Sequence, residues 1–150
     1  MSTRHISFFG FLILVLSAAG ASGQDKKSSV AKLPQKAKNF LNAYYARIDV
    51  ASVSEDVQSW FESNVYRVIL KDGKRIAFDE SGNWKEVDGK RAPLPLNLIP
   101  AEVRAYVARS FPRTEVVRMK RNKHRYHVAI SNGLQLEFNN KGKFIKIKQQ

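Results

Sequence analysis

Two histidines and one acidic turn are the residues of this chain whose spacing could bind a metal ion. His124 and His127 are three residues apart, a spacing common among metal ligands. They fall in a predicted strand, where residues i and i+3 point to opposite faces, so one ion could not readily contact both. Asp79–Asn83 resembles the start of a calcium loop, but Trp84 occupies the sixth position, where glycine is required. We therefore expect solvated histidines, an ordinary turn, no metal and no cofactor.

Nucleophilic catalysis has few candidate residues. The chain contains no cysteine and 3 histidines, and it carries no serine-hydrolase elbow, phosphate-binding loop or zinc-protease motif. The absence of cysteine also excludes disulfide scaffolds and thiolate zinc sites. Carboxylates for acid–base chemistry cannot be paired from their spacing alone. We expect a protein that is not an enzyme.

Basic side chains are more informative. The 150 residues hold 26 lysines and arginines against 13 acidic residues, a formal net charge of +13. Residues 94–150 contain 12 of the basic and 3 of the acidic residues. Within them, segment 118–125 is either a patch for an anionic partner or, the alternative that we favour, a basic loop in solvent. Its basic members are Arg118, Lys120, Arg121, Lys123 and Arg125.

Two aromatic residues, Trp84 and Phe144, are a second candidate for partner binding. If Ile147 faces the helices of the predicted fold, strand alternation turns Phe144 to the sheet face that no helix covers. Trp84 is the equivalent residue of the first half and is expected to face the same way. Aromatic rings among basic groups suit a protein or peptide interface. The alternative is a β-bulge at Gly82 or Gly142, which would return both rings to the core. The basic neighbours expected on the uncovered face are Arg67, Arg75, His127, Lys146 and Lys148.

Two similar halves must position these residues. Leu33-Pro34 and Ile99-Pro100 each precede apolar residues spaced i, i+3, i+4 and i+7, the pattern of a helix with one buried face. Proline suits the first helical position because the N–H that it lacks would have no partner there. Further along, residues 66–87 align with residues 126–147 at five identical positions of 22, and both segments alternate in polarity as strands do.

The turns complete the predicted fold. Asp72-Gly73 and Asn132-Gly133 predict hairpins with type I′ turns, which need a positive φ at two successive residues. Gly82 and Gly142 predict a second, longer turn in each half. The sequence thus predicts an α+β tandem repeat, about residues 33–92 and 93–150. Each unit has one helix and a four-stranded antiparallel meander, with both helices on one face of a curved sheet.

The first 23 residues have the three-part pattern of a signal peptide. Arg4 precedes an apolar run at residues 6–16, and Ala21 and Gly23 are the small residues expected before a cleavage site. The run is shorter than the roughly 20 residues of a transmembrane helix. We expect a periplasmic or secreted chain that starts at Gln24, with residues 24–32 as a flexible linker and no transmembrane segment. Nucleic acid is not an expected partner in that location.

These features are similar to those of a PepSY-like, β-lactamase-inhibitor-like family of secreted proteins from Bacteroidetes-type bacteria. The shared pattern is Leu33-Pro34, an amphipathic helix, and Tyr66-x-Val-x-Leu-x-Asp-Gly-x-x-Ile-x-Phe-Asp-x-x-Gly-x-Trp84, with a weaker second copy. The resemblance covers about residues 33–148 and implies the curved sheet and the export, but it assigns no binding or catalytic residue.

The resemblance and the residues lead to two hypotheses about function. The inhibitor that names the family binds an enzyme with the concave face of its sheet, which implies an exported binding module that engages a protein or peptide on the open sheet face. The alternative is a basic envelope protein that associates with anionic surface polymers.

Overall fold

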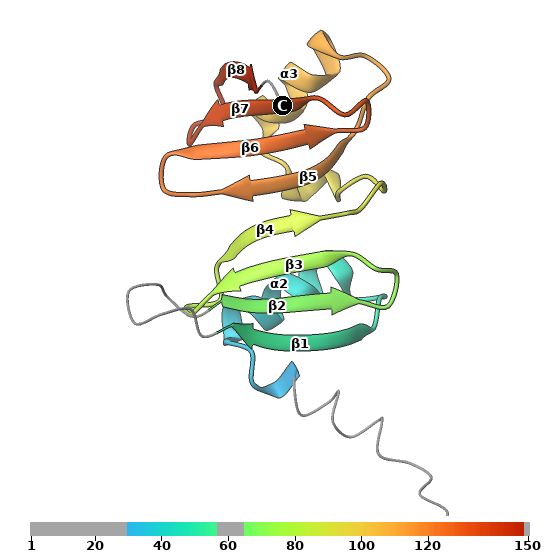
Figure 1. Ribbon diagram of the computed structural model, residues 1–150, viewed down its shortest axis with the longest axis vertical. Coiled ribbons are helices and arrows are strands. Elements are labelled where there is room, and N and C mark those ends of the chain that lie inside the picture. The colour runs from blue at the N-terminus through green and yellow to red at the C-terminus, as the bar shows by residue number, and fades with distance from the viewer. Residues whose placement is uncertain (1–29, 57–64, 149–150) are drawn as a thin grey trace, which may run out of the picture.

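The computed structural model describes residues 30–56 and 65–148, so the predicted signal peptide and most of the linker lie outside the described residues. Eight strands form one antiparallel sheet in chain order, and both described helices lie behind it (Figure 1). This confirms the α+β class and the two helices on one face; that the halves are copies of one unit stays a prediction. The elements are α2 (Gln35–Tyr45), β1 (Val50–Asp56), β2 (Val65–Leu70), β3 (Arg75–Asp79), β4 (Trp84–Asp88), the 3₁₀ turn η1 (Leu96–Leu98), α3 (Ala101–Ser110), β5 (Val116–Arg121), β6 (Arg125–Ile130), β7 (Gln135–Asn139) and β8 (Phe144–Lys148).

Each helix begins directly after a proline. Pro34 and Pro100 are the N-cap residues, one position earlier than predicted, and their carbonyl oxygens accept helical hydrogen bonds of 3.2 and 3.0 Å. The first N–H groups of a helix have no partner within the helix. A proline at this point has no N–H, so it leaves no donor unsatisfied. After α3, Pro112 keeps Phe111 out of the helical region, at φ −135° and ψ 65°.

The folded part begins before Leu33. The N–H of Leu33 donates to the carbonyl of Val30 at 3.2 Å, and Val30 packs against the core. The end of the expected linker is therefore a packed turn ahead of α2. The same turn precedes α3, where the N–H of Ile99 donates to the carbonyl of Leu96 at 3.2 Å.

The β2–β3 and β6–β7 hairpins do not have the predicted type I′ turns. Gly73, at φ +88°, is the only residue of its turn with a positive φ, and Gly133, at φ +92°, is its counterpart. Each loop has three residues and ends in a left-handed glycine. The side chain of Asp72 favours this turn because its carboxylate accepts a hydrogen bond from the N–H of Lys74 at 3.2 Å.

The core lies between the sheet and the two helices. Phe78 of β3 and Phe138 of β7 are fully buried. Each ring meets a helix aromatic edge-on, Phe78 against Phe40 at 5.4 Å and Phe138 against Tyr106 at 5.5 Å between ring centroids. These two contacts join each half of the sheet to its helix.

The β3–β4 and β7–β8 turns press against the helix N-termini. A Cβ atom at Gly82 would lie 2.8 Å from Cβ of Pro34 and 2.9 Å from the backbone nitrogen of Ala37. At Gly142 it would lie 2.8 Å from Cβ of Glu102. Both glycines have φ +79°, so glycine is needed for the conformation and for the close approach. The two turns hold each half of the sheet in place under its helix.

Candidate functional site

Trp84 does not face the uncovered side of the sheet. Trp84 pairs with Phe78 and Glu86 pairs with Ala77, so Lys85 is an extra residue in β4. This bulge interrupts the alternation of side chains and turns Trp84 toward α2. Its ring centroid lies 6.5 Å from that of Phe40.

Phe144 is placed in the same way in the second half. It pairs with Phe138, and Ile145 is the extra residue of β8. The ring of Phe144 stacks on that of Tyr106 with a centroid distance of 4.3 Å and an interplanar angle of 10°. Both rings therefore pack against the core, as in the alternative, but the bulges are at Lys85 and Ile145 and not at Gly82 or Gly142. The expectation that Trp84 and Phe144 bind a partner on the uncovered face is wrong.

The uncovered side, here called the open face, is crossed by two rows of side chains. Residues directly opposite one another on neighbouring strands share a face, so the strand register defines each row. The first row is Ser54, Arg67, Ala77, Glu86, Lys120, His127, Glu137 and Lys146. The second row is Ser52, Ile69, Arg75, Asp88, Arg118, Ala129, Gln135 and Lys148. The five basic neighbours predicted for this face all lie on it: Arg67, Arg75, His127, Lys146 and Lys148.

The segment 118–125 does not form one patch. Arg118 and Lys120 belong to the open face, but Arg121 points to the other side of the sheet. There its Nε donates to the carbonyl of Trp84 at 2.8 Å, and its guanidinium lies 4.2 Å from the centre of the Trp84 ring. Alternation along β5 separates these side chains. Lys123 lies in the exposed β5–β6 turn, whereas Arg125 is on the open face in an ion pair with Glu137.

Three carboxylates interrupt the positive charge of the open face, and the sequence reasoning missed them. Glu86 Oε2 lies 4.0 Å from Nζ of Lys120. Asp88 is directly opposite an arginine on each neighbouring strand. Glu137 is 1% exposed, and its carboxylate pairs with Arg125. Alternation around the buried Val87 and Leu136 would have placed all three on this face.

Two neighbouring hollows lie on the open face, each above an alanine of β3 or β6. The first, the Ala77 hollow, has a volume of about 540 Å³, and its charged lining is Arg67, Arg75, Arg118, Glu86 and Asp88. The second, the His127 hollow, has a volume of about 290 Å³ and is lined by Glu86, Arg118, Lys120, His127, Ala129, Gln135 and Lys148. The short alanine side chains leave space between longer neighbours. Because both hollows share Glu86 and Arg118, one partner could occupy both.

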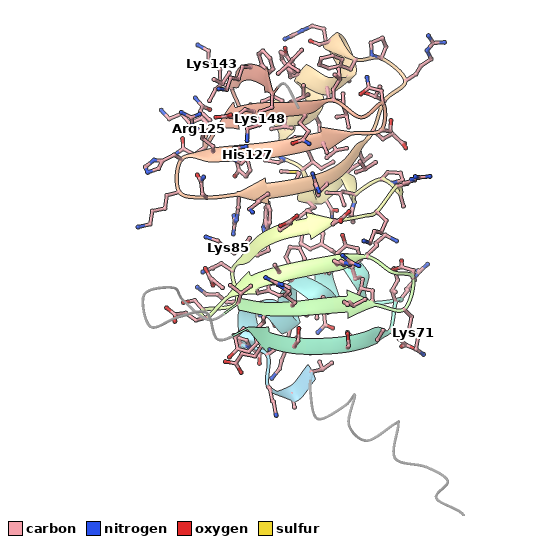
Figure 2. All side chains as sticks on the ribbon, in the orientation of Figure 1. Lys71, Lys85, Arg125, His127, Lys143 and Lys148 are labelled. Carbon is pink, nitrogen blue, oxygen red and sulfur yellow. The ribbon has the colours of Figure 1, made fainter. Side chains whose placement is uncertain are left out.

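His127 lies among cations. Partial burial first, and then the charges of Lys148, Lys120 and Arg125, lower the pKa of its imidazole below the ordinary value. Its Nδ1 is buried and has no hydrogen-bond partner within residues 30–56 and 65–148. Figure 2 shows His127, Arg125 and Lys148 together in front of the second half of the sheet. The positive potential that disfavours imidazolium would attract an anion.

The acidic turn at Asp79 and the two histidines do not form a shared cluster within the described residues. Asp79 Oδ1 accepts hydrogen bonds from the N–H groups of Ser81 and Asn83 at 3.0 and 2.8 Å, so this turn is closed by its own hydrogen bonds. His124 lies in the exposed turn before β6, apart from the His127 hollow. The described residues contain no group of three or more side chains that could hold a metal ion. Across the same part of the chain, no helix has the length and apolarity to span a membrane.

Comparison with known proteins identifies the family. A family model described as "Putative beta-lactamase-inhibitor-like, PepSY-like" matches residues 64–146. A solved structure from Bacteroides thetaiotaomicron, described as a "putative calcium-regulated periplasmic protein", is 32% identical, with a TM-score of 0.76 over 80% of this chain and 93% of that chain.

Two Bacteroides vulgatus structures, both described as putative periplasmic proteins, are also similar. One, from the DUF2874 family, is 30% identical with a TM-score of 0.74 over 80% of this chain and 93% of that chain. The other, described as of unknown function, is 28% identical with a TM-score of 0.76 over 80% and 94%. No curated protein sequence matches the chain. The chain belongs to the PepSY-like, β-lactamase-inhibitor-like family.

Proposed function

We propose that this chain is an exported, non-catalytic binding module that holds a protein or peptide on its open face. The observation that carries the proposal is the open face itself, because both described helices lie on the opposite side and two adjoining hollows are left between its side chains (Figure 1). Membership of an inhibitor-like family with relatives described as periplasmic supports export and binding.

The charge pattern favours a protein or peptide over an anionic polymer. Glu86, Asp88 and Glu137 lie between the basic residues of the two rows. A uniform polyanion would be repelled at the accessible carboxylates of Glu86 and Asp88, whereas a protein surface can offer charges of both signs. Ile69, with 38% of its surface exposed, adds an apolar contact beside the Ala77 hollow.

The arrangement of titratable groups favours binding over catalysis. His127 is the residue of the open face whose ordinary pKa lies nearest neutrality. A general base of the triad type needs an acceptor that orients its ring. No described residue hydrogen-bonds to Nδ1 of His127, and the nearby carboxylate of Glu137 is paired with Arg125.

The test is capture of the partner from an envelope fraction by cross-linking to residues 24–150, followed by mass spectrometry. Ala77→Gln fills one hollow and Arg118→Glu reverses a charge shared by both, so each is expected to reduce capture at least fivefold. Lys143→Glu makes the same kind of charge change in the exposed β7–β8 turn, outside both hollows, and should leave capture unchanged.

Two results would contradict the proposal. One is capture that survives Ala77→Gln and Arg118→Glu but is lost on Lys123→Glu, which would move the binding surface to the β5–β6 turn. The other is recovery of a polysaccharide or lipid in place of a protein, with binding abolished by 0.5 M salt. That result would favour the anionic-polymer alternative, because exposed charges are screened within a few ångströms at such ionic strength.

A further inference from the structure

We propose that the His127 hollow receives a carboxylate side chain of the partner, and that this binding favours the protonated form of His127. The inference rests on the proposed function, since it names the chemical group that a protein partner places on the open face.

The balance of charge separates the hollows. In the Ala77 hollow three arginines face two carboxylates. In the His127 hollow Arg118, Lys120 and Lys148 face a single carboxylate, that of Glu86, which lies 4.0 Å from Lys120. The His127 hollow therefore stabilises an anionic side chain more strongly than the Ala77 hollow does.

Every strand next to His127 contributes a charged group. Lys120 of β5 and Glu137 of β7 are its direct cross-strand partners, and Glu86 of β4 lies beyond Lys120. Glu137 is buried in its ion pair with Arg125, the charged neighbour on β6 itself. Lys148 of β8 also lines the hollow, and Lys146 is the next residue in the row beyond Glu137. The cations acting on His127 thus come from β5, β6 and β8.

The coupling follows from electrostatics. Without a ligand, partial burial and three cations disfavour the protonated ring and lower its pKa. A carboxylate in the hollow offsets the cations and offers an acceptor to an imidazolium N–H, so the pKa of His127 rises when the partner binds. By linkage, the affinity for the carboxylate rises as the pH falls below the bound-state pKa of His127. The full gain, about a factor of ten for each unit of pKa increase, is reached below the free-state pKa. A pKa increase of half a unit corresponds to about a threefold gain in affinity.

The proposed protein partner favours a carboxylate over a phosphate in this hollow. Both anions suit lysine, arginine and histidine donors. Carboxylates are the anionic groups that an unmodified protein partner carries.

The two histidines of residues 24–150 allow a direct test by NMR. His127 reports the hollow, and His124, in the exposed turn, is an internal control in every spectrum. Both rings are titrated between pH 4.5 and 8 with a blocked peptide of four glutamates, with inorganic phosphate, and with sodium chloride at equal ionic strength. The peptide should raise the titration midpoint of His127 by at least half a unit relative to sodium chloride and leave that of His124 unchanged. The peptide affinity should rise by the matching factor, about threefold or more.

Substitutions locate the effect. Lys148→Gln should weaken the peptide at least threefold and raise the midpoint of His127 in the free protein, since it removes a cation that acts on the ring. Lys143→Gln, the matched change in the β7–β8 turn, should alter neither quantity. His127→Gln should leave the fold intact and make the peptide affinity independent of pH above about pH 5.5, where the peptide carboxylates are ionised.

The outcomes that overturn the inference are distinct from failure of the proposed function. Equal shifts of both histidines, or a shift with phosphate and none with the peptide, would exclude a carboxylate site at His127. If the cross-linked partner is still lost on Ala77→Gln while His127 does not respond, the inference is wrong and the proposed function stands. If neither Ala77→Gln nor Arg118→Glu affects capture, the proposed function is itself wrong, whatever the peptide does.

Discussion

Gly82→Ala and Gly73→Ala form a matched pair of substitutions in two hairpin turns. The prediction that the Gly82 turn is longer is wrong, because both turns have the same length and hydrogen-bond pattern. Both glycines are left-handed, at φ +79° and φ +88°. A Cβ atom at Gly73 would meet nothing within 4 Å, whereas at Gly82 it would lie 2.8 Å from Cβ of Pro34 and 2.9 Å from the nitrogen of Ala37. The pair therefore separates the backbone penalty from the contact between the turn and α2.

The expected magnitudes differ by the steric contribution. An alanine forced into the left-handed region costs about 1–2 kcal/mol, which should be the whole loss at Gly73. At Gly82 the obstructing atoms belong to a proline ring and to the first turn of α2, and neither can rotate away. Overpacking of this kind adds about 1–3 kcal/mol. We expect Gly82→Ala to lower the free energy of unfolding by about 2–5 kcal/mol.

Urea unfolding of residues 24–150, followed by circular dichroism, measures both losses. The m-values should match that of the parent chain, so that the shift of the midpoint reports stability alone. An equal loss for the two variants would refute the reasoning, because it would mean that the β3–β4 turn moves away from α2 at no cost.

Two further predictions concern side-chain packing, and a third concerns the predicted signal peptide. Phe78→Ala should lower the free energy of unfolding by about 3–5 kcal/mol in the same urea assay, and a loss below about 1 kcal/mol would contradict its burial. Arg121→Met removes the hydrogen bond and the cation–π contact to Trp84, so thermal unfolding should show a loss of about 1–2 kcal/mol, while Lys123→Met in the exposed turn should stay within about 0.5 kcal/mol of the parent. Mass analysis of the exported protein should find an N-terminus within two residues of Gln24, and a full-length chain in the membrane fraction would contradict the signal peptide.

The helices and strands could be predicted because their signals are local. The i, i+3, i+4, i+7 spacing after Pro34 and Pro100 depends on one helix face, and both helices lie within a residue of the predicted starts. The strand pattern likewise depends on one sheet face, the face on which Val68, Leu70 and Ile76 are buried. The family resemblance rested on these same core positions and turns, and the family match confirms it.

The candidate site was predicted only in part. Arg67, Arg75 and His127 follow the alternation of uninterrupted strands, so the sequence placed them correctly on the open face. Trp84 and Phe144 lie beyond the bulges at Lys85 and Ile145, where alternation no longer applies. Because a bulge is defined by two strands together, no pattern within β4 or β8 states which residue is extra.

The sequence by itself determined the order of helices and strands, the hydrophobic face of each, and the excess of basic residues. Tertiary structure decided which side chains meet on the open face. Packing of Trp84 against Phe40 and of Phe144 on Tyr106 accompanies the bulges that take these rings from that face. The register of β4 on β5 brings Glu86 and Asp88 beside Lys120 and Arg118. Periodicity is a property of one segment, whereas the charge and shape of a sheet surface depend on the pairing of strands that are distant in the chain.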